Sequence, residues 1–147
     1  MIRAKNLDLT TEMMRRYDNV SLGDITATRS YIVFTAPFAC ILDRVDLYSN
    51  EANPPQANTA SVTNFSATLA NVVNGTAVTM TTRGTSATAT PSDSISANVR
   101  WALTPTANNS LTVGTQVRLA CTVGGSGTLS AVLCQVQYTP QKHRESR

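Results

Sequence analysis

The sequence predicts an all-β fold made of antiparallel strands, a sandwich or a barrel, and two observations support this class. Apolar and polar residues alternate with a period of two over most of the chain, which is the side-chain period of a strand with one buried face. Turn signals rich in Gly, Pro and Asn separate these stretches, and no convincing helix pattern follows residue 28. A chain of 147 residues, 41% of them apolar, is large enough for one domain with its own core.

The first 28 residues differ from the rest in charge, in methionine content and in periodicity, and they predict an extended N-terminal arm. Residues 9–17 can form one or two helical turns, but isolated helices this short are marginal in water. An ordered arm must therefore take its order from a neighbour. We expect residues 29–140 to form the sandwich and residues 141–147 to form a polar C-terminal tail.

The first strand patterns of the predicted sandwich cover residues 30–36 and 41–48, with Pro37 ending the first of them. Residues 49–59 are polar and contain Pro54-Pro55, so they predict an exposed loop. These two strands and their loop lead into the centre of the chain.

The central segment contains the clearest short-range turn signal, Asn74-Gly75. A type I′ turn needs positive φ at both central positions, which Asn and Gly supply most readily. The predicted pairing around this turn sets Leu69 opposite Met80 and Asn71 opposite Val78. Residues 84–94 are low in complexity and predict a second exposed loop.

The next alternating stretch, residues 95–103, predicts a strand with Ile95, Ala97, Val99, Trp101 and Leu103 on its buried face. The only tryptophan is therefore expected in the core. Residues 104–110 predict a turn, and residues 111–113 a short strand.

The most regular alternation lies near the C-terminus, at residues 116–123 and 132–138, on either side of Gly124-Gly125-Ser126-Gly127. This pattern predicts a long antiparallel hairpin that ends near Pro140, because proline cannot donate a ladder hydrogen bond. About eight strands result, and they favour a jelly-roll-like antiparallel β-sandwich.

Charge is concentrated at the two ends of the chain. Between residues 52 and 141 the charged side chains are only Arg83, Asp93, Arg100 and Arg118. Such a body does not attract polyanions, so we expect no nucleic acid partner. Arg15-Arg16 and residues 142–144 could each touch phosphate or an acidic protein surface, although solvated ends are the commoner case.

The three cysteines, Cys40, Cys121 and Cys134, lie in apolar strand patterns without metal-ligand spacing, and we expect them to be small buried residues. The longest apolar stretch, residues 31–42, is interrupted and too short to span a bilayer, so no membrane partner is expected. The N-terminus lacks a signal-peptide pattern, which predicts synthesis in a reducing cytoplasm.

Groups able to carry out catalysis are sparse. His143 lies in the tail, and Asp43 and Asp46 should point to opposite faces of one strand, as surface or strand-end aspartates near Arg44. We therefore expect neither an enzyme nor a cofactor nor a metal, although a calcium site made by loop carbonyls with Asp93 or Glu51 stays open.

Two stretches carry a resemblance to a known family: YIVFTAPFACILDRVDLYS at residues 31–49, and LTVGTQVRLACTVGGSGTLSAVLCQVQYTP at residues 111–140. With the Asn-Gly hairpin between them, they resemble the small jelly-roll head decoration (cement) proteins of tailed bacteriophages and related fibre-base modules. The resemblance implies a structural protein on the outer capsid surface of the virion, made in the host cytoplasm. It would assemble as a homotrimer and bridge neighbouring copies of the major capsid protein.

The arm is the segment that we expect to dock on the capsid, because it carries charges of both signs. The candidate capsid-binding side chains are Arg3, Lys5, Glu12, Arg15 and Arg16, with Met13, Met14 and Tyr17 as apolar anchors.

The alternative function is a phage fibre, receptor-binding or glycan-binding β-sandwich module that uses the loops Asn50–Thr59 and Gly84–Ser94. The small number of aromatic residues, 5% of the chain, weighs against sugar binding.

Overall fold

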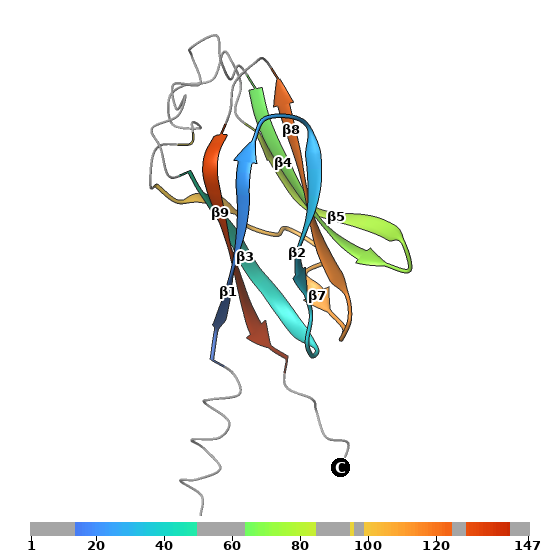
Figure 1. The fold of residues 1–147 in the computed structure, drawn as a ribbon. Helices are drawn as coiled ribbons and strands as arrows, with labels where there is room; N and C mark the ends of the chain where they lie inside the picture. Colours follow the sequence, from blue (N-terminus) through green and yellow to red (C-terminus); the bar gives the residue numbers. More distant parts are fainter. Residues whose placement is uncertain (1–13, 50–63, 85–94, 96–98, 125–128, 142–147) are drawn as a thin grey trace, which may run out of the picture.

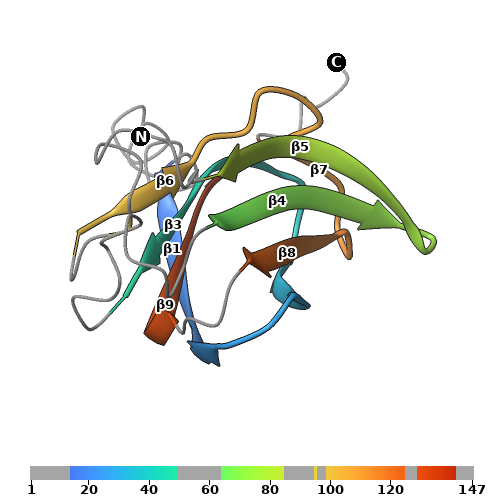
Figure 2. The same cartoon turned by 90° about the horizontal axis from the view of Figure 1, so that it is seen from above.

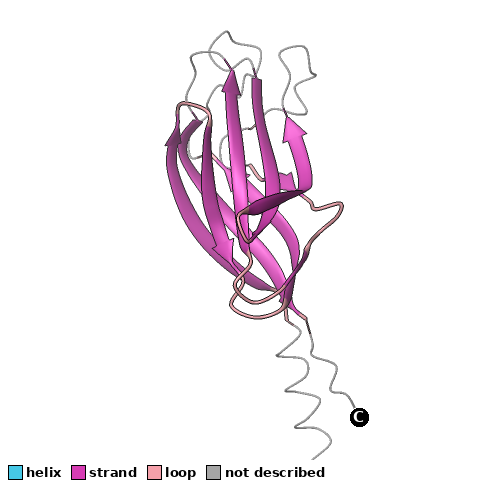
Figure 3. Ribbon diagram, turned by 90° about the vertical axis from the view of Figure 1, so that its right-hand side faces the viewer, coloured by secondary structure: helices cyan, strands magenta, loops and turns pink. Residues whose placement is uncertain are grey.

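The computed structural model describes residues 14–49, 64–84, 95, 99–124 and 129–141. Throughout these ranges the regular structure is β-strand, with no helix. The strands form two antiparallel sheets that pack face to face, which confirms the predicted β-sandwich. Figures 1 and 3 show the two sheets from perpendicular sides.

The first sheet has the strand order β1-β9-β3-β6, with the short strand β7 also paired to β3. These strands are β1 (Arg16–Ile25), β9 (Leu129–Pro140), β3 (Cys40–Tyr48), β6 (Trp101–Leu103) and β7 (Ser110–Leu111). We call this sheet A. Its pairs are all antiparallel, and β9 and β3 are its central strands.

The second sheet, sheet B, has the order β2-β8-β4-β5. Its strands are β2 (Arg29–Thr35), β8 (Gln116–Gly124), β4 (Asn64–Val73) and β5 (Thr76–Gly84). Seen from above in Figure 2, β4, β5 and β8 lie on one side of the molecule, and β1, β3 and β9 lie on the other. The chain crosses between the sheets after β1, β2, β3, β5, β7 and β8, and this repeated crossing gives the jelly-roll arrangement.

One predicted hairpin is wrong. β8 and β9 were expected to pair with each other, but β8 pairs with β2 and β4, whereas β9 pairs with β1 and β3. Each strand has one apolar face, so each can line a wall of the core, and periodicity identifies that face without identifying the partner strand. The Gly-rich segment between them therefore connects opposite sheets.

The predicted arm also needs a correction at its C-terminal end. Residues 16–25 form β1, an edge strand of sheet A whose Arg16 pairs with Tyr138 and whose Ile25 pairs with Leu129. Most side chains of β1 are exposed, which explains why its apolar alternation is weak in the sequence. The predicted tail after residue 141 and the arm before residue 14 lie outside the described residues.

The Asn-Gly turn is confirmed. Asn74 and Gly75 have φ angles of 51° and 78°, and the turn joins the paired strands β4 and β5. Asn71 pairs with Val78 as predicted, but Leu69 pairs with Thr81 because a register shift between Leu69 and Ala70 leaves Met80 as an extra residue.

The core lies between the inner faces of the two sheets. Trp101 is buried, as predicted, and its ring lies 5.4 Å from the ring of Phe65 in the opposite sheet. Arg83 of β5 joins the same edge of the sandwich, since its Nη1 donates to the carbonyl of Ala102 at 2.9 Å and its guanidinium lies 4.7 Å from the Trp101 ring centroid. Val99, expected on the buried face, is 55% exposed, and the regular strand begins only at Trp101.

We expect the substitution Gly75→Ala to lower the free energy of unfolding by about 1 kcal/mol, because a Cβ atom disfavours the positive φ at this position. Urea denaturation monitored by tryptophan fluorescence measures this loss. Nothing lies within 4 Å of the added Cβ, so the cost is conformational and not steric.

The matched control is Ala77→Ser, at an exposed position of the same hairpin. It should change the free energy of unfolding by less than about 0.5 kcal/mol. Equal stability of the Gly75→Ala variant and the wild-type protein would contradict the assigned turn.

Candidate functional site

The two ends of the described chain lie side by side at one end of the sandwich, which we call the terminal pole. β1 begins where β9 ends, Arg16 pairs with Tyr138, and the amide of Gln141 donates to the carbonyl of Ala39 at 2.9 Å. Figure 1 shows the start of β1 and the end of β9 at this end of the body. The first 16 and the last six residues are joined to this pole, and together they carry seven basic and three acidic side chains.

Arg15 is held by the body at the terminal pole. Its Nε lies 3.3 Å from Oδ2 of Asp43 on β3, and that oxygen also accepts a 2.6 Å hydrogen bond from the Thr139 hydroxyl of β9. The Arg15 side chain therefore reaches across β9, the strand between β1 and β3. Because Arg15 is half exposed, this ion pair contributes at most about 1 kcal/mol.

Arg16 is held by an aromatic contact. Its guanidinium lies 5.0 Å from the centroid of the Phe38 ring, which in turn lies 6.1 Å from the ring of Tyr138. Burial raises the pKa of the Tyr138 hydroxyl, and the charge and hydrogen bond of Asp18 raise it further, against an opposing effect of Arg16. Arg15 and Arg16 thus fix the beginning of β1 to the body.

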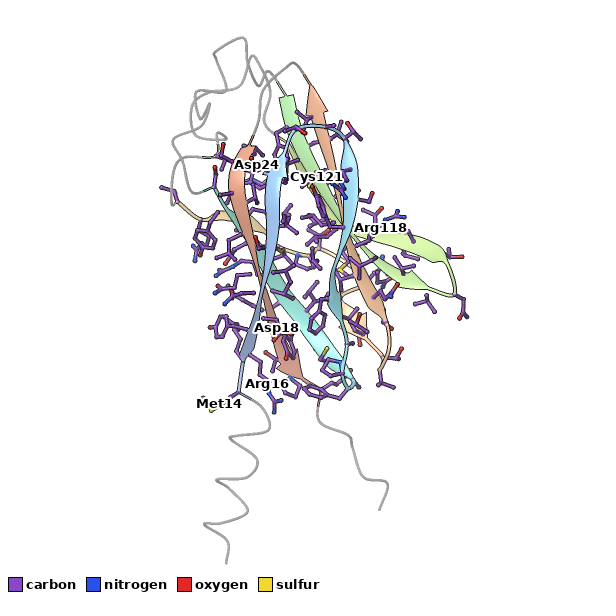
Figure 4. The ribbon with its side chains drawn as sticks, viewed as in Figure 1. Met14, Arg16, Asp18, Asp24, Arg118 and Cys121 are labelled. Atoms are coloured by element: carbon purple, nitrogen blue, oxygen red, sulfur yellow. The ribbon has the colours of Figure 1, made fainter. Side chains whose placement is uncertain are left out.

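Two of the predicted apolar anchors, Met14 and Tyr17, are exposed to solvent, whereas Arg15 and Arg16 contact the body. Met14 and Tyr17 are 58% and 54% exposed, so both present apolar surface at the terminal pole. Figure 4 shows Met14 at the start of β1, next to Arg16. The other predicted contacts, Arg3, Lys5, Glu12 and Met13, lie outside the described residues.

The two aspartates of β3 differ from the prediction. A register shift between Leu42 and Arg44 interrupts the alternation of β3, so Asp43 and Asp46 both interact with outward-facing side chains of β9 instead of pointing to opposite faces. Asp46 is also not a surface residue, since it is completely buried. The expectation of two surface aspartates on opposite faces is therefore wrong.

Asp46 belongs to a buried polar cluster with Arg44 and Gln137. Its Oδ2 accepts a 2.6 Å hydrogen bond from Nε2 of Gln137, and its Oδ1 lies 2.8 Å from Nε of Arg44. The angle at Arg44 does not satisfy a hydrogen bond, so Arg44 and Asp46 interact as opposite charges. A buried carboxylate needs such compensation, which explains the composition of the cluster.

The cysteines are buried and free, as predicted. Burial raises the pKa of the Cys40 thiol to about 11 and the pKa values of the Cys121 and Cys134 thiols to about 12. All three thiols are therefore protonated at neutral pH.

Within the described ranges, no three His, Cys, Asp or Glu side chains gather in a way that could hold a metal ion. The residues considered for a calcium site, Glu51 and Asp93, and the single histidine, His143, lie outside those ranges. The loops proposed for glycan binding also lie outside them, apart from Gly84 at the end of β5. No helix in the described part of the chain has the length and apolar character needed to cross a membrane.

Comparison with known proteins gives little similarity. No family model and no curated protein matches the sequence. Among solved structures, a clostridial cysteine protease after propeptide cleavage aligns with 86% of this chain at 10% sequence identity and a TM-score of 0.42. The chain spans 40% of the length of that protease chain.

The expectation that the protein is not an enzyme is withdrawn, since the matched structure is that of a cysteine protease. The likeness is too weak to show an enzyme either.

We expect Asp46→Ala to lower the free energy of unfolding by about 3 kcal/mol, because it leaves the partly buried charge of Arg44 and the amide of Gln137 without their partner. Asp43→Ala is the matched control, with a smaller loss of about 1 kcal/mol, since Asp43 is partly exposed, its ion-pair partner Arg15 is half exposed and its other partner is the Thr139 hydroxyl. Urea denaturation compares the two variants. Equal losses would contradict the assigned burial of Asp46.

The raised thiol pKa values predict that the native protein resists alkylation by iodoacetamide at pH 8, whereas the unfolded protein is modified at all three cysteines. Mass spectrometry counts the modified thiols. The folded state holds these thiol protons more tightly than the unfolded state, whose cysteines have the ordinary pKa of about 9. The free energy of unfolding should therefore fall as the pH rises above about 9. Rapid alkylation of the native protein would contradict the prediction.

Proposed function

We propose that this chain is a structural virion protein that decorates the outer surface of a tailed-bacteriophage capsid and stabilises it by bridging neighbouring copies of the major capsid protein. The observation that carries the proposal is the terminal pole, where β1 begins and β9 ends as paired neighbours. Both charged ends of the chain are joined to the body there, so a single pole can dock while the rest of the jelly roll faces outward.

Charge supports docking through this pole. The two end segments carry seven basic and three acidic side chains, whereas the long stretch from residue 52 to residue 141 carries four charged side chains in all. A mixed but mainly basic pole suits an acidic capsid surface, and opposite charges guide the approach of the two proteins. The nearly neutral body provides little charge of its own for this attraction.

Two arginines favour a fixed starting direction for the arm. Arg15 contacts Asp43 and Arg16 contacts Phe38, so the last residues before β1 are attached to the sandwich. Holding the arm at its base lowers the conformational entropy that docking must overcome. Beside these arginines, Met14 and Tyr17 offer exposed apolar surface, the kind of side chain that anchors protein interfaces.

A homotrimer would present three such poles to the shell. Attachment through several weak contacts raises the overall affinity by orders of magnitude when the contacts can form together. The protein would then bind without any single strong contact, on the outside of the virion and after synthesis in the host cytoplasm.

The test is removal of residues 1–13, which spares β1 and its contacts with β9. We expect the truncated protein to keep its fold but to lose most of its co-sedimentation with empty capsid shells, because residues 1–13 include four of the eight predicted capsid contacts, Arg3, Lys5, Glu12 and Met13. Binding of the full chain should also weaken between moderate and high salt, as the charges are screened.

Tyr17→Ser should weaken shell binding as well, and Val78→Ser is its matched control, at an exposed apolar residue of the β4–β5 hairpin. Circular dichroism checks that each variant is folded. Undiminished binding by the truncated protein would exclude the arm as the docking segment, and absence of shell binding by the full chain would exclude decoration of that capsid.

A further inference from the structure

The outer face of sheet B carries mostly small side chains, many of them with hydroxyl groups, and almost no charge. Its side chains alternate with the buried Val117, Leu119 and Cys121 of β8 and with their neighbours on β2 and β4. The described outward residues include Ser30, Ile32, Thr35, Thr68, Thr82, Gln116, Ala120 and Thr122, whereas Ala70 on the same face is buried. Among them Ile32 is 48% exposed, so apolar surface is present at this face.

Arg118 is the one charged side chain on this face among the described residues. It stands in the register between Ile32 of β2 and Ala70 of β4, at the middle of the sheet. Its Nε is shielded from solvent yet has no hydrogen-bond partner in the described part of the chain. The Arg118 side chain as a whole is only partly buried, so its guanidinium can meet an acceptor supplied by another molecule, and a hydrogen bond between a guanidinium and a carboxylate is one of the stronger kinds.

β1 offers the complementary charge. Asp18 and Asp24 are exposed, and neither forms an ion pair within the described residues, whereas Asp43 and Asp46 are each paired with an arginine. Asp18 is hydrogen-bonded to the side chain of Tyr138. Asp24 accepts one hydrogen bond from the amide of Ala131 at 2.8 Å, and a carboxylate can accept several. Figure 4 shows both aspartates along β1 and Arg118 on the other sheet.

We infer that copies of this chain associate through the outer face of sheet B, with Arg118 of one copy bound to a β1 carboxylate, Asp18 or Asp24, of the next. The acid and the base lie on different sheets of one molecule, so the contact joins two different surfaces and leaves each copy with one free donor face and one free acceptor edge. Such a head-to-tail contact builds a closed ring when the rotation between successive copies closes, and an open filament when it does not. The number of copies in the ring, three, rests on the proposed function. The inference itself identifies the two surfaces that meet between neighbouring copies.

The experiment is a charge exchange on the full chain, with mass in solution measured by sedimentation equilibrium. The wild-type protein should have three times the 15.7 kDa mass of the chain. Arg118→Glu should weaken association at least about tenfold, because it places an acid opposite an acid. Adding Asp18→Arg or Asp24→Arg to Arg118→Glu should restore the trimer, and the double variant that restores it identifies the paired carboxylate.

The matched control is Arg100→Glu, which makes the same charge change at an exposed arginine outside sheet B and should leave the mass unchanged. Thermal unfolding by circular dichroism confirms that each variant is folded. A wild-type monomer or dimer, a trimeric Arg118→Glu variant, or failure of both double variants to reassociate would each overturn the inference. Shell co-sedimentation of the wild-type protein is measured separately, so loss of the proposed function and loss of this interface give different results.

Discussion

The fold depends on two apolar sheet faces that must cover each other. β8 in sheet B and β9 in sheet A are the strands that make this possible, since each has neighbours on both sides and a nearly continuous row of buried residues. Their inner side chains, including Leu119 and Val136, are completely removed from solvent. The positions of β1, β2, β3 and β4 follow from pairing with these two strands, so the burial of apolar surface between them organises the whole sandwich.

Local features of the fold could be predicted from the sequence because they depend on neighbouring residues. The Asn74-Gly75 turn, the buried face of β8 and the buried Trp101 all follow from turn chemistry and a period of two. The partners of β8 and β9 could not be predicted in this way. Pairing joins residues more than a hundred positions apart, as in Arg16 with Tyr138, and alternation along one strand contains no information about them.

The candidate site shows the same division. Sequence reasoning selected the end of the chain that carries charge, but it did not foresee that Arg15 and Arg16 would bind the body through Asp43 and Phe38. The buried state of Asp46 was missed for another reason. A single extra residue in β3 reverses the faces of all that follow, and no composition or periodicity signal marks such a bulge.

Because the two ends of the described chain lie close together, the order of the strands along the chain could be changed by circular permutation without changing their arrangement in space. Since Arg16 is paired with Tyr138, a short linker from Gln141 to Met14 would close the described body into a continuous ring of strands. Opening that ring between Asn74 and Gly75, in a solvent-exposed turn, would leave every ladder intact. The same jelly roll would then present its chain ends at the tip of the β4–β5 hairpin, away from the terminal pole.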